Sequence, residues 1–183
     1  MTERSTKRTP TTNAAREGAE VAPATGRNRG TFTLERVLHA SVERVWDLWT
    51  TKKGLESWWG PDGFTTKFRR LEVRPGGELE YVMTATGPEQ IQMLESLGVP
   101  TSTTTRGTFL LVEPRTRLEL TQVADFLPGV PPYPIGAVVE LHTLAGGGVR
   151  LVVVIEKMHN AEWTKNAQMG WSSQLDRLVD LVG

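Results

Sequence analysis

Apolar and polar residues alternate along most of the chain after residue 30, and this period of two predicts β-strands. The alternating stretches are 31–39, 64–73, 78–84, 106–112, 117–126, 137–144 and 149–158. Short turns separate several of them. Arg74-Pro75-Gly76-Gly77 carries proline and glycine at the two central positions that a type II turn requires. The pattern therefore predicts successive hairpins and an antiparallel sheet of seven strands.

Three other segments are expected to be helical, and in the first and the last of them apolar residues repeat at helical spacing. Ser41 is a good N-cap for the first. Its apolar face is formed by Val42, Val45, Trp46 and Trp49. A second, shorter helix is expected over 52–57. The last begins after Asn160, a further N-cap, and carries along one face Trp163, Ala167, Trp171, Leu175, Leu178 and Val182. A twisted seven-stranded sheet bends into a saddle, and only this last helix is long enough to fill it.

Residues 1–29 contain almost no large apolar side chain, so they cannot bury enough surface to offset their ordering entropy. We expect a disordered N-terminal tail over 1–29 and one domain over 30–183. Within that domain, 85–104 looks inserted, with a short amphipathic helix that starts at Pro88. A proline-rich loop is expected over 127–136. One hypothesis is that one or both of these segments cover the cavity mouth as a lid; the alternative is a surface elaboration or a contact in a homodimer.

Five motifs fall in the order and spacing of one known family. They are 31–39, 41–49, Trp58-Trp59-Gly60-Pro61, Arg74-Pro75-Gly76-Gly77, and Gly170-Trp171 followed by Leu175 and Leu178. With these motifs, nearly all of 31–182 resembles the START-like (SRPBCC) superfamily. Within it, the chain is similar to proteins that resemble the C-terminal domain of the activator of the ninety-kilodalton heat-shock protein ATPase.

The resemblance implies an α+β helix-grip fold like that of the birch-pollen allergen. In this fold a curved antiparallel seven-stranded sheet surrounds a long C-terminal helix, with two short helices after the first strand. It also implies a cavity between the sheet and the long helix. Members of the superfamily bind lipids, polyketides, hormones or other apolar ligands. Some are cyclases or aromatases, and one branch works with a chaperone.

Composition disfavours several classes of protein. Lys+Arg and Asp+Glu both number 21, so the chain lacks the basic excess of a nucleic-acid binder. It has no cysteine, and its three histidines match no metal-ligand spacing, so we expect no metal and no cofactor. No apolar run approaches the roughly 20 residues of a membrane span. The N-terminus also lacks the apolar core of a secretory signal, which predicts a cytoplasmic protein.

No residue is assigned a catalytic role from the sequence. Nucleophile motifs are absent, and most of the strand carboxylates are expected on the outer face of the sheet because they alternate with apolar residues. These are Glu78, Glu80, Glu119, Asp125, Glu140 and Glu156. An enzyme would need an ionisable group buried in the cavity, and the sequence does not identify one.

The candidate cavity residues are aromatic, apolar or neutral and polar. They are Trp58, Trp59, Tyr81, Met83, Leu118, Leu120, Gln122, Trp163 and Trp171. Such a mixture is typical of a small-molecule site. The main prediction is therefore binding of a small apolar molecule, lipid-like or aromatic. Two alternatives stay open: a protein that interacts with a chaperone as an ATPase activator, and an enzyme of the polyketide cyclase or aromatase type.

Overall fold

The computed structural model describes residues 29–183, so all of the expected disordered tail 1–29 except Arg29 lies outside the described residues. Seven strands form a single antiparallel sheet in the order β1-β7-β6-β5-β4-β3-β2. Their bounds are β1 Thr31–Leu38, β2 Phe64–Leu71, β3 Glu78–Ala85, β4 Ser102–Glu113, β5 Arg117–Ala124, β6 Tyr133–Thr143 and β7 Val149–Glu156. From β2 onward, strands that follow one another in the sequence are neighbours in the sheet. β1 pairs with β7 at the other edge.

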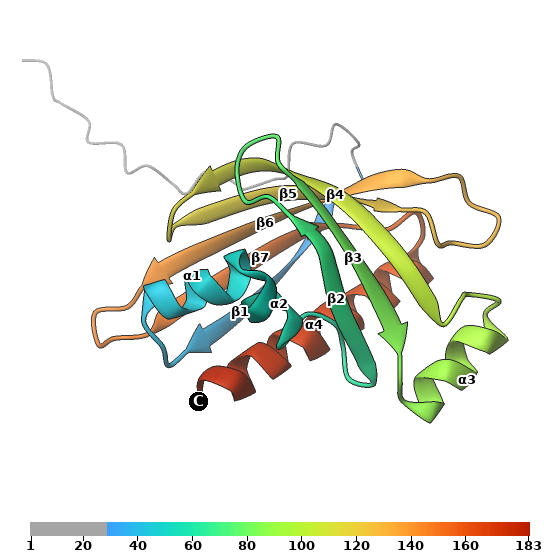
Figure 1. The fold of residues 1–183 in the computed structure, drawn as a ribbon, viewed down its shortest axis with the longest axis horizontal. Coiled ribbons are helices and arrows are strands. Elements are labelled where there is room, and N and C mark those ends of the chain that lie inside the picture. The colour runs from blue at the N-terminus through green and yellow to red at the C-terminus, as the bar shows by residue number, and fades with distance from the viewer. Residues whose placement is uncertain (1–28) are drawn as a thin grey trace, which may run out of the picture.

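The helices are α1 Val42–Thr50, α2 Lys52–Glu56, α3 Pro88–Ser96 and α4 Ala161–Val182. Figure 1 shows the long α4 running along one side of the curved sheet, with α1 and α2 at one end of the molecule and α3 at the other. This arrangement confirms the predicted α+β helix-grip fold. Within residues 29–183, no helix combines the length and the apolar character needed to cross a membrane.

The predicted helix caps and the first hairpin turn are confirmed. Ser41 Oγ accepts a hydrogen bond from the backbone N–H of Arg44 at 3.2 Å, and Asn160 Oδ1 accepts one from Trp163 at 2.8 Å. In the β2–β3 turn, the N–H of Gly77 donates to the carbonyl of Arg74 at 2.8 Å. Gly76 has φ +74°, a backbone conformation that a side chain would strain. Local sequence chemistry thus determines where these elements begin and turn.

Two β-bulges contribute to the curvature of the sheet. The pairing register shifts between Phe68 and Arg70 in β2 and between Phe109 and Leu111 in β4. A bulge inserts one extra residue into a strand and increases its local bend and twist. The sheet therefore presents a concave face, and the main hydrophobic core lies between that face and the helices.

Two strands begin well before the predicted residue, whereas the other strand boundaries lie close to the prediction. β4 begins at Ser102 rather than residue 106, since the threonine-rich run before Arg106 pairs fully with β3. The stretch between β3 and β4 is therefore shorter than the expected 85–104 insertion. β6 begins at Tyr133 rather than residue 137, so only the first part of 127–136 is loop. Pro134 is tolerated there because it lies next to the start of the strand, where its missing N–H costs least.

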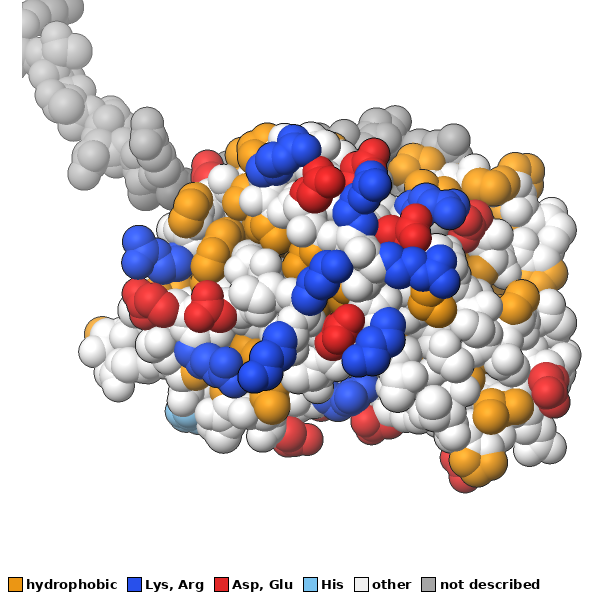
Figure 2. Space-filling model, viewed as in Figure 1, with side chains coloured by type: hydrophobic (Ala, Val, Ile, Leu, Met, Phe, Trp, Pro, Cys, Tyr) orange, Lys and Arg blue, Asp and Glu red, His pale blue; other side chains and the backbone are white. Residues whose placement is uncertain are grey.

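The outer face of the sheet carries alternating basic and acidic side chains. Glu80 lies 3.0 Å from Arg106 and 3.8 Å from Arg69, and Arg117 bonds both Glu119 and Glu140. On the face turned toward the viewer, Figure 2 likewise shows basic side chains next to acidic ones. These carboxylates lie where the sequence pattern predicts. Because each is paired on the outer face, none is available to the concave interior.

Candidate functional site

A cavity of about 290 Å³ lies between the concave face of the sheet and α4. Strands β3 to β7 supply one wall, and the inward side of α4 supplies the other. The cavity reaches the surface, since Pro100, Val123 and Asn166 belong to its wall and are exposed. The hollow that the resemblance implies is therefore present in the fold.

Six of the nine candidate residues come together in the wall of this cavity: Trp59, Tyr81, Met83, Gln122, Trp163 and Trp171. Trp59 lies near the centre of this group. Its ring is 6.0 Å from the ring of Tyr81 and 5.4 Å from that of Trp171, both in edge-to-face geometry. The loop before β2, strand β3 and helix α4 thus meet at one aromatic contact.

Three candidates lie outside the cavity wall. Trp58 is fully buried, and its indole N–H donates to the carbonyl of Leu48 at 3.0 Å, so it fastens the loop to α1. Leu118 and Leu120 do face the concave side, but they lie farther along β5 beside a void of only about 20 Å³. The tryptophans of α1 and the following loop fill that end of the sheet, which leaves no room for a ligand there.

Several wall residues escaped the sequence analysis. Leu94 and Val99 come from the segment between β3 and β4, and Phe126 comes from the loop after β5. The first proposed lid segment, 85–104, therefore does border the cavity. Phe126 lies just before the second, 127–136, of which only Ile135 in β6 belongs to the wall. Gln174 was also missed, although a polar residue three positions after Trp171 in the apolar face of α4 was a usable signal.

The polar groups of the wall gather around Tyr81. Its hydroxyl lies 3.5 Å from Gln122 Oε1, and Thr105 is its direct neighbour in the β3–β4 register. Burial raises the pKa of the Tyr81 phenol, and the neighbouring polar groups of Trp59, Thr105 and Gln122 offset only part of that rise. Tyr81 is therefore a neutral hydroxyl at ordinary pH and can donate a hydrogen bond.

The loop that carries Trp59 is fastened to α4. The N–H of Gly60 donates to Gln174 Oε1 at 3.1 Å, and Arg177 donates to the carbonyl of Gly60 at 2.7 Å. Gly60 has φ +110°, which a residue with a Cβ rarely adopts. Because both bonds use the backbone of Gly60, they hold Trp59 against Trp171 while Gln174 completes the wall.

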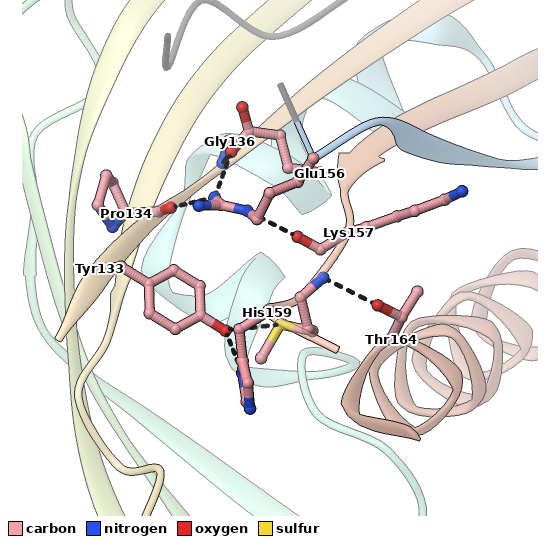
Figure 3. Close-up of polar contacts among 9 residues, drawn as sticks. Tyr133, Pro134, Gly136, Glu156, Lys157, His159 and Thr164 are labelled. Carbon is pink, nitrogen blue, oxygen red and sulfur yellow. Dashed lines mark hydrogen bonds and ion pairs between the residues drawn. The ribbon is translucent and has the colours of Figure 1, made fainter. Parts of the chain in front are cut away.

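A network of polar contacts lies where the start of β6 and the end of β7 meet the start of α4 (Figure 3). Arg29 donates to Glu156 at 3.0 Å and to the carbonyl of Pro134 at 2.7 Å, and its guanidinium lies 4.9 Å from the ring centre of Tyr133. Glu156, 3% exposed, also accepts the N–H of Gly136 at 3.0 Å. Arg29, one residue before the expected domain start, therefore already makes contacts with the folded domain.

This network also positions part of the cavity rim. The hydroxyl of Tyr133 lies 3.0 Å from His159 Nδ1 and accepts the backbone N–H of the same residue at 3.2 Å. Tyr133 packs in one small cluster with Met158 and Trp163, both of which belong to the cavity wall. The polar network therefore fixes the entry into α4, the helix that forms one side of the site.

The wall offers little for acid–base or metal chemistry. Among the described residues, none that borders the cavity is Asp, Glu, His, Lys or Arg. Residues 29–183 likewise contain no cluster of three metal-ligating side chains. Glu156, a strand carboxylate that does lie buried, is occupied by Arg29 and Gly136 rather than facing the cavity. The arrangement suits enclosure of a neutral apolar molecule.

Comparison with known proteins agrees with this fold. Among solved structures, a Chromobacterium violaceum protein has 26% sequence identity and a TM-score of 0.67, covering 83% of this chain and 96% of that chain. One from Nitrosomonas europaea has 27% identity and a TM-score of 0.62, over 85% and 95%. The AHSA1 protein of Silicibacter pomeroyi has 18% identity and a TM-score of 0.64, over 82% and 95%, and shows the fold alone.

No curated protein matches the chain. The family model described as "Activator of Hsp90 ATPase homolog 1-like protein" matches residues 39–183. This match spans the two short helices, the loop with Trp59, strands β2 to β7 and the whole of α4. The chain therefore belongs to the Activator of Hsp90 ATPase homolog 1-like family.

Proposed function

We propose that the protein binds a small, mainly apolar molecule in the cavity between α4 and the sheet. The observation that carries the proposal is an apolar cavity of about 290 Å³. Small-molecule sites begin at about this size and have this kind of lining. Water would fill the space with roughly ten molecules at liquid density. An apolar guest would release that water from a mostly apolar wall, which is favourable.

Binding is better supported than catalysis. A cyclase or aromatase moves protons, so it needs a side chain that can act as acid or base near the bound substrate. Tyr81 is the one titratable group among the described residues of the wall, and burial shifts its pKa away from neutrality. A general base requires a pKa near the working pH, and the phenol of Tyr81 does not meet that condition.

Activation of a heat-shock protein ATPase is the second candidate, and the description of the matching family favours it. Purified protein is added to a ninety-kilodalton heat-shock protein, and ATP hydrolysis is followed. The candidate predicts a rate that rises and saturates with added protein. An unchanged rate over the same concentration range removes it, and this result leaves the ligand-binding proposal intact.

A neutral fluorescent probe tests the proposed function directly. N-phenyl-1-naphthylamine is titrated into the full chain, and saturable fluorescence enhancement at one site per molecule is expected. Gly170 belongs to the wall, and a Cβ built there meets no heavy atom within 4 Å. Gly170→Leu therefore extends an apolar side chain into open space at the cavity and should weaken binding at least tenfold.

Met169→Leu is the matched control for this variant. Met169 is the neighbouring residue of α4, is 62% exposed and does not border the cavity. This substitution should leave probe affinity unchanged. Equal binding to the Gly170→Leu variant and to the unmodified chain would place the probe elsewhere, and absence of saturable binding to the unmodified chain would refute the proposal.

A further inference from the structure

The polar part of the cavity wall has an excess of donors. Gln122 Nε2 is buried and has no hydrogen-bond partner among the described residues, although Gln122 Oε1 is paired with the hydroxyl of Tyr81. Leaving a buried donor unpaired is costly, and proteins rarely do so without a reason. Other atoms of the Gln122 side chain border the cavity, so a rotation of the amide would bring Nε2 to a bound molecule, which can complete this bond.

A second unpaired donor lies close to the same place. The indole N–H of Trp49 is buried without a partner, and Trp49 borders the small void of about 20 Å³. Gln122 and Trp59 belong to the walls of both the void and the main cavity, so the two spaces are neighbours. The unpaired oxygens among the described side chains, on Thr66 and Thr121, border neither space. The site therefore calls for a hydrogen-bond acceptor.

The cavity wall also determines whether a bound ligand can carry a charge. No cationic side chain among the described residues borders the cavity, and Arg177 near it is already bonded to the carbonyl of Gly60. A carboxylate or phosphate placed here would lose its hydration without gaining a counter-charge, which is strongly unfavourable. A cationic ligand meets the same difficulty, since no carboxylate is present in the wall.

We propose that the natural ligand is a neutral, mainly apolar molecule with one carbonyl oxygen, as in an aromatic or alicyclic ketone. The carbonyl accepts from Gln122 Nε2 beside Tyr81, and the remaining skeleton lies against Trp59, Trp171 and the apolar floor. A carbonyl suits the site better than a hydroxyl because it brings no proton of its own into a region that already has surplus donors. This proposal rests on the proposed function and names the class of molecule that it concerns.

Three probes of one shape test the class: 2-acetylnaphthalene, 2-isopropenylnaphthalene and 2-naphthoate, each titrated into the full chain by calorimetry. The ketone should bind about tenfold more tightly than the hydrocarbon, the ratio expected for one buried hydrogen bond. The carboxylate should bind at least tenfold more weakly than the ketone. If the hydrocarbon equals the ketone, or the carboxylate binds most tightly, the class is wrong while the proposed function survives. If none of the three binds, both fail.

Gln122→Leu should reduce ketone affinity about tenfold and leave hydrocarbon affinity unchanged or improved, because only the donor is lost. Met83→Leu, on the apolar wall, is the control and should change both affinities alike. Infrared spectroscopy of 2-acetylnaphthalene bound to the unmodified chain tests the same hydrogen bond without a variant, which matters if Gln122→Leu does not fold. The frequency of the carbonyl stretch should be lower in the bound ketone than in cyclohexane. A cyclohexane-like frequency would overturn the proposal.

Discussion

The guanidinium of Arg29 lies 3.0 Å from the carboxylate of Glu156, and this pair joins the first described residue to the end of β7. The two side chains are 16% and 4% exposed. Removing one partner of a buried pair leaves the other charge without compensation. Arg29→Met should therefore lower the free energy of unfolding by about 3 kcal/mol, measured by urea denaturation.

The control for Arg29→Met is Arg150→Met. Arg150 pairs with Glu35 at 3.5 Å, but these side chains are 46% and 54% exposed. Exposed pairs of this kind contribute less than about 1 kcal/mol. The double variant Arg29→Met/Glu156→Gln should recover part of the loss, since it removes the unpaired charge. If Arg29→Met and Arg150→Met lowered the free energy of unfolding by similar amounts, the Arg29–Glu156 pair would contribute no more than an exposed pair.

A second carboxylate, that of Glu56, makes the stability of the folded chain depend on pH. Glu56 accepts the backbone N–H of Phe68 at 2.8 Å and the ammonium of Lys67 at 3.2 Å. The Phe68 bond is the main cause that lowers the Glu56 pKa. A lowered pKa adds stability at neutral pH, and this is lost as pH falls below the ordinary value toward the folded one.

Glu56→Gln removes this dependence. The variant should lose about 1 kcal/mol at pH 7 and progressively less as the pH falls, because the unmodified chain also loses the contribution there. Urea denaturation of both chains from pH 7 to pH 3 measures the difference. A difference that stays constant with pH would contradict this role for Glu56.

Tyr81 predicts the opposite behaviour at alkaline pH. Burial raises its pKa in the folded chain, so the folded state holds the proton more firmly than the unfolded state. Stability should therefore be constant below the ordinary tyrosine pKa of about 10 and fall as the pH rises above it. Thermal unfolding from pH 8 to pH 11 should show a smaller alkaline decrease for Tyr81→Phe than for the unmodified chain.

The sequence predicted the fold well because its signals are local. The Ser41 and Asn160 caps, the turn through Gly76 and the apolar face of α4 each depend on residues within a few positions of one another. Boundaries were less predictable where two signals compete. The threonine-rich start of β4 and the Pro134 region of β6 both look like loop, yet pairing with a neighbouring strand makes them extended.

The candidate site was predictable in part for a related reason. Alternation along a strand shows which side chains point to the same face of the sheet, and it therefore placed Leu120 and Gln122 on the same face. It does not show how far along the strand the interior stays hollow. That depends on where α1 and its tryptophans fill the concave face, which is a tertiary property. Trp58 and Trp59 likewise differ in role because only one side of their loop faces the cavity.

The segment between β3 and β4 provides the remaining prediction. Leu94 of α3 belongs to the cavity wall, whereas Met93 is 49% exposed and lies outside it. No residue of α3 is buried, so the helix contributes little to the core. If α3 acts as a lid, Leu94→Ser should speed probe release and Met93→Ser should not. Stopped-flow displacement of N-phenyl-1-naphthylamine measures both rates.

Replacing 88–98 by two glycines tests the lid more severely. The N–H of Ala85 donates to the carbonyl of Thr101 at 2.8 Å, so the flanking strands are already close enough for a short turn. The stability of the empty protein should change by less than about 1 kcal/mol, because only exposed or half-buried residues of α3 are lost. Probe release should become about tenfold faster, equivalent to roughly 1.4 kcal/mol of lost contact. Unchanged release with unchanged stability would make α3 a surface elaboration, since a helix that closes the cavity cannot be removed without opening a path for the ligand.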